Sequence, residues 1–508
     1  MSPREPAARA AGTSVAGLFR AAARLRPDAL ALAGPGAAGS LTYRQLADRV
    51  ARAARALRDR GVDAGDRVAV LSTNRTEYLE AFLACAWLGA VAACQNWRLA
   101  PGELAHCLDL VEPSVILAAP DQRERLAERD EWTLEFGASW ERAIEGADPL
   151  PHPVDVNPED AFLILYTSGT TGLPKAAVIS HRAAIARNLV TRAELGIAPT
   201  DAFVAWSPLY HMGGAEYSLG TLMTGGAVHV VDGYDEDALV AHIRETDLGW
   251  LLLMPGMVGR LADRLEAEGI TSRSIRCCGV MADLVPAHDL ARITRLLDAP
   301  YVNTFGATET GNPPASAGLL AVGEPPESLA KTQSAFCEVR LVDHDGQDAP
   351  DGQPGELWMR GPTLFSGYWR DPDATAAAFA HGWFHMGDVF SRNPDGTLTF
   401  VDRRKYLIKS GGENIYPAEL ERVLLADPRV KEAAVVRHPD PTWGEVPVAF
   451  VARTDASLTE DAVVQLCRDQ LASYKKPRAV HFIAEDAFPR SASGKIVRSA
   501  LEARLEEM

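Results

Sequence analysis

Short apolar runs that alternate with helical stretches restrict the fold of this 508-residue chain most strongly. Residues 43–57 keep the apolar spacing of a helix, Gly61 provides a stop, and residues 67–71 follow with the pattern of a strand. Further runs of the same kind occur at 162–166, 203–206, 228–231, 251–254 and 301–304. Buried strands that alternate with helices predict an α/β fold built from layered subdomains.

The pattern changes twice toward the C-terminus. Residues 338–401 carry Asp-Gly and Pro-Gly turns between short β-like stretches, which is typical of antiparallel hairpins and indicates a β subdomain. After Lys405 helices are expected at 417–425 and 460–471, with strands near 430–436, 447–451 and 480–483. We therefore expect a large N-terminal domain over residues 1–402 and a small α+β domain over 403–508.

The charge balance argues against nucleic acid as a partner, because 51 Lys and Arg face 68 Asp and Glu and leave a net charge of −17. No membrane span is expected: the longest apolar stretch, 81–94, has 14 residues and is interpreted as a buried helix. The first residues contain no apolar secretion segment, which favours a cytoplasmic location. The seven cysteines have no metal-binding spacing and are expected to be reduced.

The strongest chemical motif follows the apolar run at 162–166. It reads Thr167-Ser168-Gly169-Thr170-Thr171-Gly172-Leu173-Pro174-Lys175. Glycines let backbone amides approach an anion, and the hydroxyls and the lysine add donors, so the segment predicts a polyphosphate cradle. It differs from a Walker A loop, since its glycines are three residues apart and Ala176 follows the lysine.

Together with five further motifs, this segment resembles the acyl-adenylate-forming superfamily, in particular its acyl-CoA synthetases and aryl-CoA ligases. The further motifs are Phe305-Gly306-Ala307-Thr308-Glu309, 382–388, 402–405, 410–415 and 489–495. The resemblance covers nearly the whole chain. It implies an acid–thiol ligase that uses ATP and Mg²⁺ to form an acyl-AMP and then transfers the acyl group to coenzyme A.

The resemblance also implies roles in adenylation. The phosphate loop would hold pyrophosphate, Glu309 would hold Mg²⁺, Thr308 would contact the α-phosphate, and Lys495 would bridge carboxylate and phosphate. Phe305 would stack on adenine, beside Gly279 of the adenine-side segment. Asp388 would bind the ribose hydroxyls, and Arg403 would lie in the ribose region. The acid would lie near Trp206, His211, Gly213, Met281, Gly306 and Ala307, where His211 is either a gate or a packing residue. With no acidic mate for a substrate ammonium, an apolar or aromatic acid is favoured.

The second step implies a mobile C-terminal domain that rotates about Lys405. Ser410, Gly411 and Gly412 would then line a pantetheine channel. For the nucleotide end of CoA, the resemblance points to Trp443 and Tyr474 for stacking and to Lys476 and Arg478 for phosphate.

Three departures from the family pattern leave alternatives open. Ala176 replaces a usual glycine, the segment 278–283 is bulkier than usual, and Lys409 adds a cation before the Gly411-Gly412 loop. The first two lie where ATP is expected, and added methyl groups in close-packed positions cost about 1–3 kcal/mol. An enzyme that only thioesterifies preformed acyl-AMP, and one that acylates a carrier-protein phosphopantetheine, are the alternatives. A homo-oligomeric state is also left open.

Overall fold

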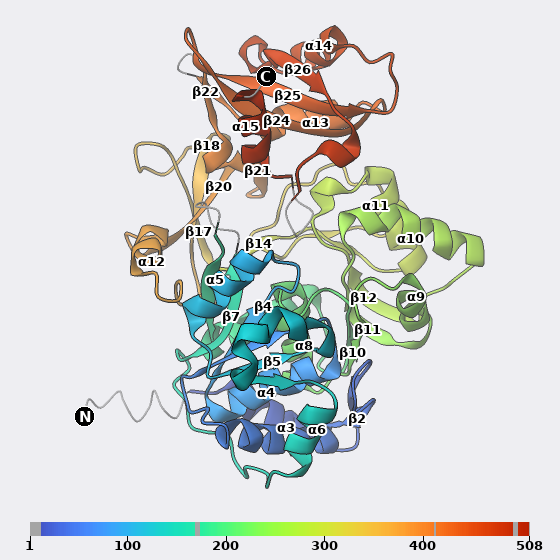
Figure 1. Cartoon of the computed structure of the whole chain (residues 1–508). Coiled ribbons are helices and arrows are strands. Elements are labelled where there is room, and N and C mark those ends of the chain that lie inside the picture. Colours follow the sequence, from blue (N-terminus) through green and yellow to red (C-terminus); the bar gives the residue numbers. More distant parts are fainter. Residues whose placement is uncertain (1–11, 168–172, 411–412, 491–495, 507–508) are drawn as a thin grey trace. The chain divides into compact units, whose positions relative to one another are not determined.

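The computed structural model describes residues 12–167, 173–410, 413–490 and 496–506. Its contacts divide the chain into two compact units (Figure 1). Unit 1 comprises Met1–Glu338 and Arg360–Phe384, and unit 2 comprises Val339–Met359 and His385–Met508. The predicted α/β class, with a large N-terminal part and a smaller α+β part, is confirmed. The boundary between 402 and 403 stays a prediction about which part of the chain moves.

A six-stranded sheet in unit 1 carries the phosphate motif. All its neighbouring strands are parallel except the last pair, which is antiparallel. The order is β6 (Thr133–Glu135), β5 (Val115–Ala118), β3 (Arg67–Leu71), β4 (Val91–Gln95), β7 (Ala161–Thr167) and β8 (Lys175–Ser180). The strands predicted at 67–71 and 162–166 are confirmed as β3 and β7.

A second sheet in unit 1 has eight strands, parallel except at its two edges. The order is β16 (Leu319–Leu320), β13 (Tyr301–Val302), β12 (Ser274–Cys278), β11 (Asp247–Leu251), β9 (Ala202–Ala205), β10 (Val228–Val230), β1 (Leu30–Ala33) and β2 (Leu41–Thr42). The helices α9 (Glu236–Glu245), α10 (Pro255–Glu268) and α11 (Ala287–Leu297) share its apolar core, and α10 and α11 lie side by side in Figure 1. The run predicted as a strand at 251–254 instead ends β11 and leads into α10.

The other helices of unit 1 include one that is buried at every residue. The set is α2 (Val15–Leu25), α3 (Tyr43–Arg58), α4 (Thr76–Leu88), α5 (Pro101–Val111), α6 (Ala138–Glu145), α7 (His181–Leu195), α8 (Met212–Thr224) and α12 (Pro372–Ala378). The fully buried helix is α4. The prediction of one helix over 81–94 is wrong, because Gly89 takes a left-handed φ of 71° that ends α4, and β4 follows. No helix in the described ranges is long and apolar enough to cross a membrane.

Unit 2 is mainly antiparallel. One sheet has the order β17 (Glu338–Val342), β18 (Pro354–Arg360), β20 (Trp383–Arg392) and β19 (Phe379–Ala380), and β21 (Leu398–Arg403) also pairs with β20. Of these strands, β19 belongs to the part of the chain assigned to unit 1. The other has the order β23 (Glu413–Ile415), β22 (Ile408–Ser410), β25 (Gly444–Arg453) and β24 (Val430–Asp440), with β26 (Ala479–Phe482) beside β25. The helices are α13 (Pro417–Leu425), α14 (Glu460–Gln470) and α15 (Arg498–Glu506). The helices and strands predicted after Lys405 are therefore confirmed.

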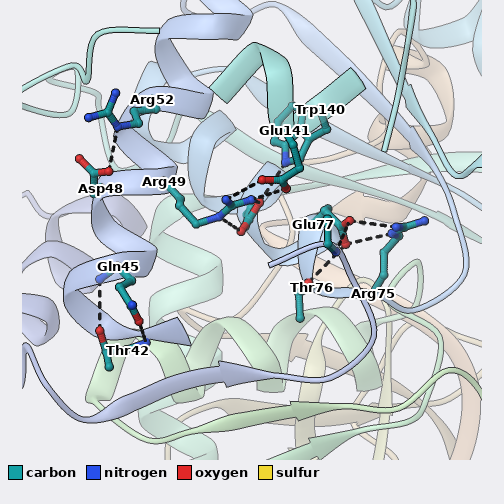
Figure 2. A network of polar contacts seen from close by, with 12 residues as sticks. Thr42, Gln45, Asp48, Arg49, Arg52, Arg75, Thr76, Glu77, Trp140 and Glu141 are labelled. Carbon is teal, nitrogen blue, oxygen red and sulfur yellow. Dashed lines mark hydrogen bonds and ion pairs between the residues drawn. The ribbon is translucent and has the colours of Figure 1, made fainter. Parts of the chain in front are cut away.

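A buried ion-pair network joins three helices of unit 1 (Figure 2). Arg49 of α3 pairs with Glu80 of α4 and with Glu141 of α6, each at 2.6 Å. The Trp140 indole N–H donates to the second oxygen of Glu80 at 2.9 Å. Burial raises the pKa of Glu80, and Arg49 opposes that shift. Because the Glu80 side chain is 0% exposed, its charge depends on this partner.

We predict that Arg49→Met destabilises the protein by about 3–5 kcal/mol, because it leaves the Glu80 carboxylate buried without its cation. Urea unfolding followed by circular dichroism measures the change. Arg55→Met is the matched control, since Arg55 pairs with Asp59 on the surface at the C-terminal end of the same helix, with 43% and 51% exposure. It should cost less than about 1 kcal/mol. Equal losses in the two variants would contradict the prediction.

Candidate functional site

The predicted phosphate loop joins two paired strands. Thr167 at the end of β7 lies opposite Lys175 at the start of β8, so the loop begins and ends at fixed positions. Ser168, Gly169, Thr170, Thr171 and Gly172 lie outside the described residues. Ala176 is buried and packs in a core cluster with Val91 and Ile164. Strand alternation puts Lys175 on the opposite face. The Ala176 methyl group, which departs from the family pattern, therefore lies in the core.

Lys175 and Glu309 come together through a tyrosine that the sequence analysis missed. The Lys175 ammonium lies 5.2 Å from the ring centroid of Tyr368, and the Tyr368 hydroxyl donates to Glu309 Oε1 at 2.9 Å. Burial raises the pKa of Tyr368 strongly, and the Glu309 carboxylate adds to the effect. The phenol therefore stays protonated and remains a donor. A residue predicted to bind phosphate and one predicted to bind metal share one contact partner.

The Thr308-Glu309 pair lies at the tip of a tight hairpin between β14 (Phe305–Ala307) and β15 (Gly311–Ala315). The Ala307 amide donates to the Thr310 hydroxyl at 3.0 Å, which closes the turn. A side chain at Gly306 would place its Cβ 2.0 Å from the Gly311 carbonyl oxygen, so only glycine fits there. The hairpin thus presents Thr308 and Glu309 at a defined position.

The bulky segment 278–283 is held by aromatic donors. Trp250 donates its indole N–H to the Gly279 carbonyl at 2.9 Å, and the Tyr301 hydroxyl donates to the Val280 carbonyl at 3.1 Å. Gly279 has a φ of 75°, and a Cβ there would overlap the Tyr301 ring at 2.0 Å. Met281 has a left-handed φ of 51°, which is strained for a side chain of its size. Residues 279–283, called the wall below, are therefore held in place by Trp250 and Tyr301, although they depart from the family pattern.

Helix α8 carries the residues predicted to contact the acid. His211 occupies its N-cap position, and Gly213 lies one turn before Tyr217 on the face that meets β11. The Tyr217 ring lies 4.6 Å from that of Trp250 and 5.8 Å from that of Phe203. These three aromatic residues line a cavity of about 20 Å³ together with Asn188 and Thr191, and none of the residues predicted to contact the acid lines it. Trp206, in contrast, is a core residue whose indole N–H donates to the Leu252 carbonyl at 2.8 Å.

A second residue that sequence analysis missed fixes the loop before His211. The buried Asn74 amide nitrogen donates to the carbonyls of Ala205 and Ser207 at 3.0 and 2.9 Å. Its oxygen accepts the Leu209 amide at 2.9 Å. Asn74 stands between β3 and α4, far from this loop in sequence. A lone asparagine before a helix looks like an ordinary cap, so no sequence signal identifies this contact.

In unit 2 the structure pairs the two predicted ribose ligands. Asp388 and Arg403 lie opposite each other on β20 and β21, and their side chains form an ion pair at 3.1 Å. The predicted hinge Lys405 follows two residues later, in a 3-10 turn spanning Arg404–Tyr406. Just before it, Asp402 accepts the Ala418 amide of α13 at 2.7 Å. The chain on both sides of Lys405 is thus anchored within the same unit.

The residues predicted to bind CoA include two exposed aromatic side chains. Trp443 is 50% exposed and Tyr474 is 42% exposed, as stacking on a nucleotide base requires. Ser410 pairs with Gly444, which places it next to Trp443. Lys476 and Arg478 follow Tyr474 and lead into β26. Lys409, the extra cation, is exposed, and its backbone N–H donates to Glu445 at 2.9 Å. Gly411, Gly412 and Lys495 fall outside the described residues.

The predicted metal site offers one carboxylate, that of Glu309, among the described residues. No group of three or more His, Cys, Asp or Glu side chains that could hold an ion occurs within the described parts of the chain. Mg²⁺ keeps several waters and binds through one or two carboxylates together with substrate phosphates. A single carboxylate, Glu309, beside a phosphate loop therefore fits Mg²⁺ and does not fit a closed structural site such as that of zinc.

Comparison with known proteins then decides the family. The model of the AMP-binding enzyme family matches residues 19–369, and that of the AMP-binding enzyme C-terminal domain matches residues 419–495. The chain belongs to the AMP-binding enzyme family. The family's two parts thus occur in the expected order, and the predicted resemblance is confirmed.

Relatives in this family are CoA ligases. Feruloyl-CoA synthase from an Amycolatopsis species is 36% identical over 492 residues, 95% of this chain and 97% of that protein. Indoleacetate–CoA ligase from Aromatoleum aromaticum is 35% identical over 478 residues, 90% of this chain and 91% of that protein. The predicted class of enzyme, an AMP-forming acyl-CoA ligase, is confirmed, and neither alternative to it is favoured.

Solved structures agree with the fold. ATP-bound MatB from Rhodopseudomonas palustris has a TM-score of 0.84 at 28% identity and covers 97% of this chain and 99% of that one. The o-succinylbenzoate CoA synthetase from Bacillus subtilis, in complex with its acyl-adenylate intermediate, has a TM-score of 0.83 at 27% identity, covering 96% of this chain and 97% of that one.

We predict that Tyr368→Phe lowers pyrophosphate exchange by about 10- to 100-fold, because a hydrogen bond to a charged group contributes roughly 1.5–3 kcal/mol. The phenylalanine ring keeps the contact with Lys175. Tyr234→Phe is the matched control, since Tyr234 donates to Glu236 at 2.7 Å in a pair of the same chemistry. It should keep exchange within twofold. Comparable losses in both variants would show that the Tyr368 hydroxyl has no special role.

Proposed function

We propose that this enzyme joins an aromatic or apolar carboxylic acid to coenzyme A in two steps. First, a carboxylate oxygen attacks the α-phosphorus of ATP, and pyrophosphate leaves from the acyl-AMP that forms. Then the CoA thiol loses its proton and attacks the acyl carbonyl carbon, and AMP leaves from the resulting thioester. The observation that carries this proposal is the Lys175–Tyr368–Glu309 contact beside the phosphate loop.

The first step brings two anions together, so the site must offset negative charge and hold the reactants in line. Lys175 supplies a cation at one end of the phosphate loop, and Thr308 supplies a hydroxyl at the hairpin tip. Tyr368 orients the Glu309 carboxylate, which would hold Mg²⁺. When bound, this ion offsets charge on the ATP phosphates. Fixed donors act strongly at such a site because they need no reorganisation as charge develops.

The residues predicted to contact the acid favour an apolar or aromatic acid. These residues are Trp206, His211, Gly213, Met281, Gly306 and Ala307, and none of them is acidic. A substrate ammonium would therefore find no carboxylate among these residues. The relatives named for ferulate, indoleacetate and 2-succinylbenzoate, all aromatic acids, support the same class.

For the second step, we assign residues 403–508 to a domain that turns about Lys405. In that state Ser410, Gly411 and Gly412 line the pantetheine channel, and Trp443 and Tyr474 stack on the CoA base. Lys476 and Arg478 pair with its phosphates. The exposure of both aromatic side chains supports this assignment. A cytoplasmic location is supported by seven cysteines, none of them in a disulfide.

The substrate proposal is tested with a panel of aryl, long-chain aliphatic and amino acids, supplied with ATP, Mg²⁺ and CoA. Mass spectrometry should detect acyl-AMP and the CoA thioester in one reaction. We expect kcat/KM for the best aryl acid to exceed that for amino acids by at least about 100-fold, because an unpaired ammonium in an apolar pocket costs several kcal/mol. A preference for amino acids would refute the proposed substrate class.

We predict that Lys495→Ala lowers acyl-AMP formation by about 100-fold or more, since a fixed cation at developing charge is worth about 10²–10³ in rate. Conversion of supplied acyl-AMP and CoA to thioester should stay within about threefold of the wild type. Lys431→Ala, which removes an exposed lysine paired with Glu485, is the control for both assays. Equal loss of the two half-reactions would contradict the assignment of Lys495 to adenylation alone.

A further inference from the structure

A fully buried lysine in unit 1 has no role in the mechanism above. The Lys331 side chain is 0% exposed. Its ammonium donates to the Asp283 carboxylate and to the Asn303 side-chain oxygen. Burial lowers the pKa of Lys331, and Asp283 opposes that shift. A buried ammonium is costly unless it is paired and hydrogen-bonded, and here it has one partner of each kind.

The two partners stand on two different segments of the candidate site. Asp283 lies in the 3-10 turn Ala282–Leu284, two residues after Met281, in the wall supported by Trp250 and Tyr301. Asn303 lies two residues before Phe305, at the start of the segment that ends in Thr308 and Glu309. The Lys331 ammonium therefore connects the wall to the segment that carries Phe305, the proposed adenine ligand, and Glu309, the proposed metal ligand.

The Asn303 side chain makes this tie rigid. Its amide nitrogen donates to the carbonyls of Leu329 and Ala330, both at 3.1 Å, immediately before Lys331. Its oxygen accepts from the Lys331 ammonium itself. Asn303 is 1% exposed, so its polar groups depend on these partners. Asn303, which directly follows β13, therefore holds both the backbone before Lys331 and the ammonium at the end of the Lys331 side chain.

We propose that Lys331 is a positioning residue that sets the spacing between the 279–283 wall and the 305–309 segment, and thereby the fit of the nucleotide. This inference rests on the proposed function, which places AMP between these segments. The backbone of Met281 supports this inference, because a strained residue with a left-handed φ persists only where its surroundings fix it. Asp283 is 43% exposed, so the pair reaches from the protein interior to the accessible side of the wall.

The test compares variants of Lys331 and Asp283 with a buried ion-pair variant whose contacts include no site residue. Lys331→Met keeps an unbranched apolar side chain and removes the charge, and Arg49→Met does the same in the α3–α4–α6 network. Both should lower the melting temperature. We expect Lys331→Met to raise the Kd for AMP, measured by calorimetry, and the KM for ATP in pyrophosphate exchange by about 10-fold or more. Displacements of about 1 Å are known to cost up to 10²-fold in rate. Arg49→Met should leave both constants within twofold.

Asp283 supplies a second pair of variants in case Lys331→Met does not fold. Asp283 is half-exposed, so Asp283→Ala should fold and still raise the Kd for AMP by at least about fivefold. Asp283→Asn keeps an oxygen that can accept from Lys331 and should stay within about threefold of the wild type. An unchanged Kd for AMP in Asp283→Ala, or an equal rise in Arg49→Met, would overturn the positioning role. Failure of the proposed function would appear differently, as wild-type protein that binds AMP but forms no acyl-AMP from any acid.

Discussion

The carboxyl ends of β9, β11, β12 and β13 meet at one edge of the eight-stranded sheet, because these neighbouring strands run parallel. Every segment that we assign to the acid and the nucleoside in unit 1 leaves that edge. A parallel sheet concentrates loops in this way whatever their sequence, so chemistry is placed where the strands end. What distinguishes one such site from another is how firmly each loop is held.

In this protein, buried side chains hold these loops in place by donating hydrogen bonds to backbone carbonyls or to one another. Asn74 holds the loop before α8, Trp250 and Tyr301 hold the wall after β12, and Lys331 with Asn303 holds the segment after β13. Each donor is buried, so losing its partner would leave an unsatisfied polar group at a cost of about 1–3 kcal/mol. The supports therefore favour a single loop arrangement, which is what in-line attack on a phosphate requires.

The sequence predicted most elements where one physical signal dominated. The apolar run at 67–71 and the Pro-initiated helix at 417–425 predict β3 and α13 with the same first and last residues that the structure shows. The stretch 81–94 was misassigned because a fully apolar run has no period, and a single glycine, Gly89, decided where helix became strand. Motifs located Lys175 and Glu309 as candidate ligands, but Tyr368 and Asn74 act through distant contacts that no local pattern encodes. The position of the Ala176 methyl group was not predictable for the same reason, since only the strand register shows that this group enters the core.

The Asp402 contact with α13 bears on how the chain behaves near Lys405. A carboxylate that accepts an amide of a helix's first turn stabilises it by about 1 kcal/mol. Any rotation at Lys405 that separates Asp402 from Ala418 forfeits this bond, and 1 kcal/mol corresponds to about a fivefold bias between two states. The hydrogen bond therefore favours one orientation of the chain at Lys405. This preference is small enough that the binding energy of a nucleotide or thiol substrate can overcome it.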